Sequence, residues 1–334
     1  MQHKDYGKSV STFGAWSGEK LAQAHRLTVG SWNTWSGCLS DTCSDPEAVI
    51  KFAIERTRQC DIIGLYEVHE FRRECTERFV QPRSAKGRAG RIDLEFLKRV
   101  AAAVSDTHKL EFVAHFNQTA LHDCEATDLP VDYGNAILVR KRLYKLPHKV
   151  VIDRFLVYGV GDLNTEDSVT LRGRPASRQG FLVTVQTDNQ SLTVAFVHGL
   201  WTKRGKIDIP ARLAQSTYIA QAIRHHRTRQ NLRSDEMQTI VIGDLNYTSN
   251  LTAFQALLEN PNAFGEGGGT NLTPNMDTRT RWYPEDKPTR QANFIAASEA
   301  ARVRILSKRI EQGEEVLSDH AYLELVYNNS PGTH

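Results

Sequence analysis

Short runs of apolar residues recur along the chain, and most of them end in glycine or in a polar side chain. Runs of this length that are rich in β-branched residues are typical of strands buried on both faces. Such strands are predicted at residues 27–32, 61–67, 110–116, 136–139, 150–160, 180–185, 192–197, 239–242, 293–297 and 321–327.

Between several of these runs, apolar residues recur at helical spacing. The pattern predicts four helices. One begins at Pro46, two cover residues 94–104 and 212–224, and one follows residue 250. Alternating strands and helices, with no internal repeat or clear linker, predict a single domain over residues 26–330. Residues 1–25 are rich in Gly, Ser, Lys and His, and we expect them to form a poorly ordered extension.

The predicted strand at residues 239–242 is followed by Gly243, Asp244 and Asn246. Gly243 permits a sharp turn, and side chains two positions apart on an extended chain point the same way. Asp244 and Asn246 are therefore expected to reach one ligand together, and an ordinary Asp/Asn turn is the alternative.

The residues after this strand decide between those two interpretations. A helix with residues 248–250 as its polar N-cap is predicted next, and α/β enzymes place chemistry where a strand passes into a helix. The same tetrapeptide at residues 161–164 leads only into polar sequence and is interpreted as a loop.

Other predicted strands are also flanked by polar side chains of the kinds that bind metals or phosphate. These are Asn33, Glu67, His198, Asp319 and His320. Scattered carboxylate and amide oxygens suit a hard divalent cation such as Mg²⁺ better than they suit zinc.

Composition narrows the class of protein only moderately. The chain has 334 residues, 40% of them hydrophobic and 24% charged, as is ordinary for a globular protein with a large core. Its net charge of +3 is compatible with a phosphate-bearing partner without requiring one. No apolar run is long enough to span a membrane, and residues 1–25 lack the apolar segment of a secretory signal. We therefore expect a cytoplasmic monomer, although a toxin exported by a dedicated secretion system would look the same.

The five cysteines are odd in number and include no Cys-x-x-Cys pair. They are Cys38, Cys43, Cys60, Cys75 and Cys124. We expect these cysteines to be reduced thiols. Cys38 and Cys43 could form a disulfide if the protein enters an oxidising compartment.

Two basic segments stand out in the polar sequence. Residues 82–91 hold Arg83, Lys86, Arg88 and Arg91, and residues 201–206 hold Trp201, Lys203, Arg204 and Lys206. Such segments are usually solvated surface, but cations beside an aromatic ring are also the mixture that binds a nucleic acid backbone and stacks on its bases.

Six short motifs occur in an order that matches a known family. They are Ser31-Trp32-Asn33, Leu65-Tyr66-Glu67-Val68, Gly134-Asn135-Ala136-Ile137-Leu138, Val197-His198, Gly243-Asp244-Leu245-Asn246 and Ser318-Asp319-His320. On these motifs, which extend over residues 27–327, the sequence resembles the endonuclease/exonuclease/phosphatase superfamily, whose fold is that of deoxyribonuclease I.

The resemblance implies an α/β (α+β) four-layer sandwich, in which two mixed β-sheets pack face to face between helices. It also implies Mg²⁺-dependent phosphoester hydrolysis, with Mn²⁺ able to substitute. Glu67 would be the principal metal ligand with Asn33 beside it, and Asp319 a further metal or water contact. Asp244 would activate the attacking water, Asn246 would hold the phosphate, and His198 and His320 would bracket the phosphoryl group. On the substrate side we expect Asn135, Arg178, Trp201, Lys203 and Arg204.

One position departs from the family pattern. Family members commonly carry an aspartate that pairs with the histidine numbered His320 here, and Asn293 occupies the matching position. An amide can accept a hydrogen bond and orient the ring, but it cannot stabilise an imidazolium by charge.

These observations predict a metal-dependent nuclease acting on DNA or RNA. A phosphatase or a phospholipid or inositol phosphate phosphodiesterase on the same fold is the second hypothesis, although no long hydrophobic hairpin that would contact lipid is evident. The third is a catalytically weak binding scaffold, which only Asn293 favours.

Overall fold

The computed structural model describes residues 26–34, 46–71, 79–80, 92–117, 131–145, 148–159, 178–187, 190–201, 207–232, 238–248, 251–273, 293–311, 320 and 322–329. The extension predicted at residues 1–25, the basic segment at residues 82–91 and the loop at residues 161–164 lie outside them.

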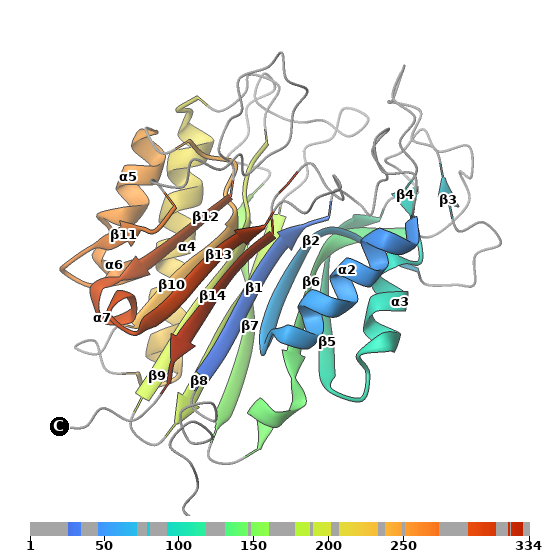
Figure 1. Ribbon diagram of the computed structural model, residues 1–334. Coiled ribbons are helices and arrows are strands. Elements are labelled where there is room, and N and C mark those ends of the chain that lie inside the picture. Colours follow the sequence, from blue (N-terminus) through green and yellow to red (C-terminus); the bar gives the residue numbers. More distant parts are fainter. Residues whose placement is uncertain are drawn as a thin grey trace, which may run out of the picture.

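Two six-stranded mixed sheets form the centre of the molecule (Figure 1). The first contains β1 (Arg26–Asn33), β2 (Ile62–Phe71), β5 (His108–Asn117), β6 (Val131–Arg140), β13 (Ile305–Glu311) and β14 (Tyr322–Asn328), in the order β13-β14-β1-β2-β6-β5. The second contains β7 (Lys149–Tyr158), β8 (Arg178–Thr187), β9 (Gln190–His198), β10 (Gln238–Asp244), β11 (Gly269–Asn271) and β12 (Asn293–Ser298), in the order β11-β12-β10-β9-β8-β7. Among the described strands of these sheets, β1 pairs in parallel with β2 and β9 with β10, while the other neighbours are antiparallel. A separate short ribbon pairs β3 (Phe79–Val80) with β4 (Ile92–Asp93).

Helices cover the outer face of each sheet, which completes the predicted four layers (Figure 1). On the first sheet lie α2 (Pro46–Gln59) and α3 (Phe96–Ala103), and on the second lie α4 (Pro210–Arg229), α5 (Thr252–Leu258) and α6 (Pro261–Phe264). Two short helices, α7 (Glu299–Arg302) and the 3₁₀ helix η3 (Lys141–Tyr144), connect strands. The predicted sandwich is confirmed.

The core between the two sheets follows from alternation along the strands. Every second residue of β9 from Leu192 to Phe196 belongs to this core, and the intervening Ala195 and Val197 pack against the helices. Both faces of these strands are therefore covered, which is why the strands appear as continuous apolar runs in the sequence.

The last turns of α4 are fixed to the second sheet by a buried polar network. His226 Nδ1 contacts Asp153 on β7, and His226 Nε2 lies 2.7 Å from Thr184 Oγ1 on β8. Burial lowers the pKa of His226, so a neutral ring donates to Asp153 and accepts from Thr184. Arg229 Nη2 donates to the same Asp153 oxygen at 2.7 Å.

The start of α5 differs from the prediction. Leu251 occupies the N-cap position and supplies no side-chain hydrogen bond, while residues 249–250 of the predicted cap lie outside the described residues. The Asp208 carboxylate instead accepts from the backbone N–H groups of Thr252 and Ala253, at 2.8 and 3.0 Å. A carboxylate from a distant segment thus satisfies the free donors at the helix start.

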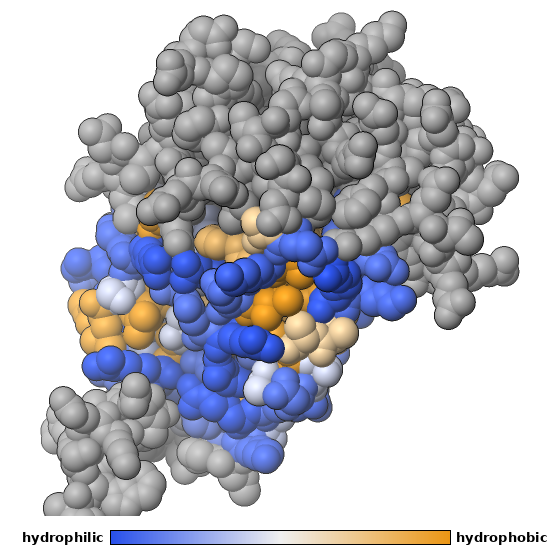
Figure 2. Space-filling model, turned by 45° about the vertical axis from the view of Figure 1, so that its right-hand side comes forward, coloured by the Kyte–Doolittle hydropathy of each residue, from blue (hydrophilic) through white to orange (hydrophobic). Residues whose placement is uncertain are grey.

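In the view of Figure 2 most of the described surface is hydrophilic, with smaller apolar areas between. No helix among the described residues combines the length and the apolar character that crossing a membrane requires. Cys60 is a free, buried thiol whose pKa burial raises to about 12, which fits the predicted reduced state for that residue. The other four cysteines lie outside the described residues.

Candidate active site

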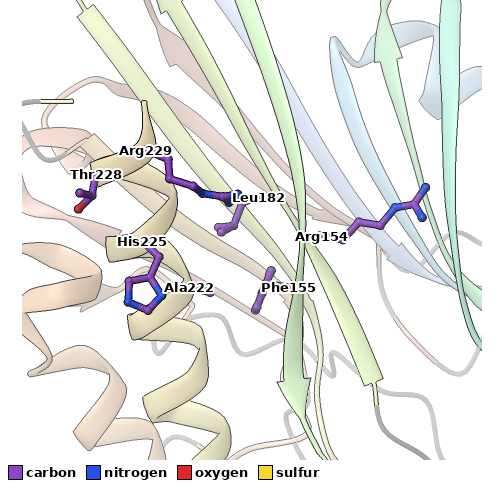
Figure 3. Close-up of a pocket in the computed structure, with 7 residues that line it drawn as sticks. All are labelled: Arg154, Phe155, Leu182, Ala222, His225, Thr228 and Arg229. Atoms are coloured by element: carbon purple, nitrogen blue, oxygen red, sulfur yellow. The ribbon is translucent and has the colours of Figure 1, made fainter. Parts of the chain in front are cut away.

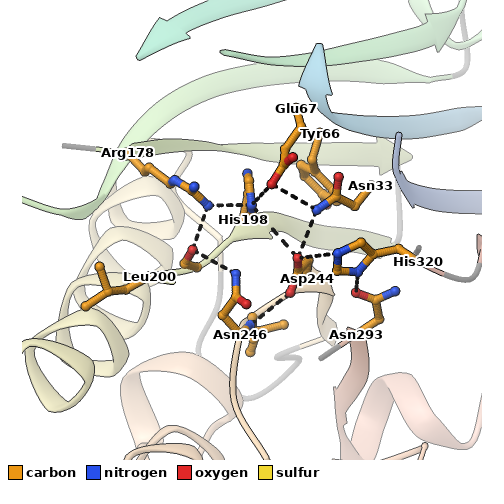
Figure 4. Close-up of polar contacts among 12 residues, drawn as sticks. Asn33, Tyr66, Glu67, Arg178, His198, Leu200, Asp244, Asn246, Asn293 and His320 are labelled. Atoms are coloured by element: carbon orange, nitrogen blue, oxygen red, sulfur yellow. Dashed lines mark hydrogen bonds and ion pairs between the residues drawn. The ribbon is translucent and has the colours of Figure 1, made fainter. Parts of the chain in front are cut away.

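Polar side chains occupy inner-face positions of five strands at one end of the sandwich. Figure 4 shows Asn33, His198, Asp244 and Asn293 among them. The five side chains are Asn33 on β1, Asn135 on β6, His198 on β9, Asp244 on β10 and Asn293 on β12. Each continues the alternation that places core residues two, four or six positions away between the sheets. In the second sheet, Asp244 pairs in register with both His198 and Asn293, so three of these residues lie side by side.

A β-bulge brings Glu67 to the same inner face. Leu65 pairs with Ala136 and Val68 pairs with Gly134, so Tyr66 and Glu67 together oppose Asn135. Glu67 has a left-handed backbone, with φ of 55°. Without the extra residue, simple alternation would turn Glu67 toward the helix-covered face to which Leu65 belongs.

Asp244 is the most connected side chain of the site. Its Oδ2 accepts from Asn33 Nδ2 at 2.9 Å and lies 3.6 Å from His320 Nε2, while its Oδ1 accepts from the backbone N–H of Asn246 at 3.0 Å. Only 2% of Asp244 is exposed. Hydrogen bonds to both oxygens favour the ionised carboxylate and fix its orientation.

The sequence pattern predicts that Asn246 reaches the site along an extended strand, and the structure differs. β10 ends at Asp244, and Asn246 has a left-handed backbone with φ of 54°. Its side-chain Nδ2 donates to Gly199 O at 3.2 Å, so it links the ends of β9 and β10. Gly243 lies within the strand rather than in a turn. A Cβ atom there would lie 2.1 Å from Val197 O, so glycine is required for the close approach of the two strands.

Glu67 and Arg178 are charged, and both contact His198. His198 Nε2 lies 3.3 Å from Glu67 Oε1, and Arg178 Nη1 contacts the same ring nitrogen and donates to Gly199 O at 2.8 Å. Burial lowers the pKa of His198, and the Arg178 charge lowers it further, so the imidazole is neutral.

The pKa of the Glu67 carboxyl is lowered, whereas the pKa of an isolated buried acid is raised. Burial alone would raise its pKa, but the adjacent His198 ring and the positive charge of Arg178 hold that pKa well below its usual range. Among the described residues, the charged groups of the site are therefore the carboxylates of Glu67 and Asp244 and the guanidinium of Arg178.

Asn293 lies where the sequence pattern places it, against His320. Its Oδ1 is 3.1 Å from His320 Nδ1. Because a carboxamide oxygen can only accept, the ring carries a proton on Nδ1, and Nε2 faces Asp244. The backbone oxygen of His320 accepts from Trp32 Nε1 at 3.2 Å, which holds this residue from the other side.

The remaining predicted substrate contacts are less closely gathered. Asn135 Nδ2 donates to Gln179 O at 2.9 Å, next to Arg178 in the chain, so this side chain supports the start of β8. Trp201 is 40% exposed and follows the end of β9 by three residues. Lys203, Arg204 and Asp319 lie outside the described residues.

The residues present fit a hard divalent cation through few protein ligands. Glu67 is 18% exposed at its side chain, and Asn33 Nδ2 lies 3.4 Å from its Oε1. Among the described residues no group of three His, Cys, Asp or Glu side chains is arranged to hold a metal ion. Mg²⁺ is commonly held by one or two carboxylates and several waters. Glu67 can supply one such carboxylate. Asn33 would offer oxygen only after its carboxamide turns over, because here its nitrogen faces both carboxylates.

A separate cavity of about 450 Å³ lies between α4 and the strands β7 and β8 (Figure 3). Its lining includes Phe155, Leu182, Ala222 and Arg229, and none of the site residues described above. This cavity is therefore not the candidate active site.

Three residues that support the site were not found from the sequence. Tyr66 lies beneath Glu67, Gly199 joins the ends of β9 and β10, and Gln215 on α4 bonds to both of the loops that follow those strands. Gly199 directly follows a strand-end histidine, which is a usable signal. Gln215 carried no signal, because a lone glutamine in an amphipathic helix is ordinary.

Comparison with known proteins identifies the fold. No protein-family model and no curated protein sequence matches this chain. Solved structures do match. An endonuclease/exonuclease/phosphatase from Bacteroides vulgatus has a TM-score of 0.51 and 14% identity, covering 90% of this chain and 98% of that one. One from Beutenbergia cavernae has a TM-score of 0.54 and 15% identity, covering 93% and 73%. The human nocturnin catalytic domain with bound sulfate has a TM-score of 0.53 and 12% identity, covering 91% and 93%.

Proposed function

We propose that this chain, which has the fold of the endonuclease/exonuclease/phosphatase superfamily, is a Mg²⁺-dependent phosphodiesterase that cleaves DNA or RNA. The observation that carries the proposal is the convergence of two carboxylates, two imidazoles and a guanidinium at one end of the sandwich. Phosphoryl transfer requires a base for water, positive charge for the phosphoryl oxygens and a group that helps the leaving oxygen depart.

Each of these tasks has a candidate among the described side chains. Asp244 is ionised, oriented by Asn33 and Asn246, and suited to take a proton from the attacking water. Arg178 supplies fixed positive charge for the phosphoryl oxygens, and His198, which lies against Arg178 and Glu67, is the candidate partner of the leaving oxygen. His320, oriented by Asn293, faces Asp244 from the opposite side.

Glu67 would hold Mg²⁺, with Asn33 and Asp319 as further ligands and Mn²⁺ as a substitute. The cation, when bound, would stabilise negative charge on the phosphoryl group. Asn135 would support substrate binding through the start of β8, where Arg178 lies.

Nucleic acid is favoured as the substrate by the side chains expected around this site. Trp201 exposes an indole close to the end of β9, and Lys203 and Arg204 follow it in the sequence. Bases stack on exposed aromatic rings, while adjacent cations bind the backbone. The sulfate in the nocturnin structure is consistent with this fold accepting a tetrahedral anion.

A cleavage panel tests the proposal. Wild type, Glu67→Ala and His198→Ala are incubated with Mg²⁺ and single-stranded DNA, double-stranded DNA, RNA, phosphoinositides or phospholipids. We expect nucleic acid cleavage by wild type that both variants lose. If wild type hydrolyses only the phospholipids or phosphoinositides, the protein is instead a phosphatase or lipid phosphodiesterase of the same fold. No turnover, together with no heat of Mg²⁺ binding in calorimetry, would leave a binding scaffold.

A further inference from the structure

The hydroxyl of Tyr66 joins the two sheets directly beneath the candidate active site. It donates to the backbone oxygen of Ile242 on β10 at 3.2 Å and accepts from Ser31 Oγ on β1 at 3.3 Å. Tyr66 is 1% exposed, so its hydroxyl is shielded from bulk solvent. One oxygen thus connects β1 and β2 of the first sheet with β10 of the second.

All three connected residues lie one or two positions before site residues in the chain. Tyr66 precedes Glu67, Ser31 lies two positions before Asn33 on the same face of β1, and Ile242 lies two positions before Asp244 on the same face of β10. The hydroxyl is therefore placed to fix the separation between Glu67 on one sheet and Asp244 on the other. The Tyr66 ring also lies beside His198, with ring centroids 5.7 Å apart.

The sequence reserves the space that the Tyr66 ring occupies. A Cβ atom at Gly243 would lie 2.7 Å from the Tyr66 hydroxyl oxygen, and one at Gly64 would lie 3.1 Å from it. Two glycines from opposite sheets thus leave room for this side chain, and any larger residue at Gly243 would displace it.

We propose that Tyr66 is a positioning residue, whose hydroxyl sets the distance between Glu67 and the His198–Asp244 pair that hydrolysis requires. This inference rests on the proposed phosphodiesterase function. Tyr66 is buried beneath the site, and it acts through the three strands that its hydroxyl joins.

The chain contains a matched control at the opposite end of the sandwich. Tyr327 on β14 donates through its hydroxyl to the side-chain oxygen of Gln238, the first residue of β10. Tyr327 is fully buried and belongs to the same core between the sheets. Tyr66→Phe and Tyr327→Phe therefore each remove one buried hydroxyl that crosses between the sheets, and only the first lies beneath the site.

Kinetics and thermal unfolding of the two variants test the inference. We expect a similar decrease in Tm for both. Tyr66→Phe should lower kcat about tenfold with KM within about twofold of wild type, because small misplacements of catalytic groups cost rate more than ground-state binding. Tyr327→Phe should leave kcat unchanged, and Ser31→Ala, which removes only the donor to the Tyr66 hydroxyl, should lower kcat by a smaller factor.

Imidazole ¹H–¹⁵N spectra give a readout that does not depend on activity. Tyr66→Phe should shift the side-chain signals of His198 and His320, and Tyr327→Phe should not. If wild type cleaves no substrate, the proposed function fails while these spectra still decide whether Tyr66 positions the site. Equal kcat values for the two Phe variants, unshifted imidazole signals in Tyr66→Phe, or a Tyr66→Phe protein that does not fold would overturn the inference.

Discussion

Gly199 lies at the site in a position where one added methyl group would meet the backbone of the neighbouring loop. Its N–H donates to Asp244 O at 2.7 Å, and its carbonyl accepts from Arg178 at 2.8 Å and from Asn246 at 3.2 Å. Four residues proposed to act in catalysis or substrate binding, counting the adjacent His198, are therefore fixed relative to one another through this backbone.

The size of the perturbation follows from the local geometry. In Gly199→Ala the new Cβ would lie 2.1 Å from Leu245 O and 2.6 Å from Leu245 C, where ordinary contacts begin near 3.4 Å. Both obstructing atoms are backbone, so the loops after β9 and β10 must separate by roughly 1 Å to accommodate it. Overpacking of this kind costs about 1–3 kcal/mol of unfolding free energy.

The effect on activity should exceed the effect on stability. A misplacement of about 1 Å between catalytic groups can cost about 10²-fold in rate, so we expect kcat for Mg²⁺-dependent diester hydrolysis to fall by that order. The assay compares kcat and the denaturant midpoint of wild type, Gly199→Ala and Gly267→Ala. At Gly267 the methyl group of alanine would meet no heavy atom within 4 Å, and the backbone is open to alanine, so this control should match wild type. Wild-type kcat in a folded Gly199→Ala protein would refute the reasoning.

Three further predictions concern stability. Asp208→Ala should lower the unfolding free energy by about 1 kcal/mol, because α5 loses its cap, and should leave kcat unchanged; chemical denaturation measures the first and the diester assay the second. His226→Phe should cost about 2–4 kcal/mol in the same denaturation experiment, because Asp153 and Thr184 both lose a buried partner. The folded-state pKa of Glu67 is depressed, so its contribution to stability is present above its ordinary value of 4.5 and is lost as pH falls below that value. Glu67→Gln should therefore be less stable than wild type at pH 7, and the difference in unfolding free energy between the two proteins should narrow as the pH falls. A difference that does not change with pH would contradict the interaction of the Glu67 carboxylate with His198 and Arg178.

The sequence was most informative where a residue's position depends only on strand alternation. Asp244 and His198 each end a continuous apolar run, and the parallel pairing of their strands places them in register. Asn293 begins the antiparallel neighbour and pairs with Asp244. Burial of both strand faces makes such runs visible, and their ends then mark one edge of the sheet.

Features that depend on distant segments could not be obtained in this way. The bulge at Tyr66 and Glu67 arises from how β2 pairs with β6, and the local residue pattern does not predict it. The cap of α5 comes from Asp208, more than forty residues earlier in the chain, and the sequence around the helix start does not indicate it. Asn246 reaches the site through a left-handed turn stabilised by Asp244, which an extended-strand extrapolation misses.

The most direct test of the central claim is hydrolysis of bis(p-nitrophenyl) phosphate by wild type and Asp244→Asn, each with Mg²⁺ and with excess EDTA. Asparagine keeps the shape of Asp244 but cannot take a proton from water, so we expect kcat to fall by about 10²–10⁴-fold. Wild-type turnover should vanish in EDTA and return when Mg²⁺ is restored. Equal turnover by the two proteins, or wild-type hydrolysis that EDTA leaves unchanged, would contradict the assignment of this cluster as a metal-dependent phosphodiesterase site.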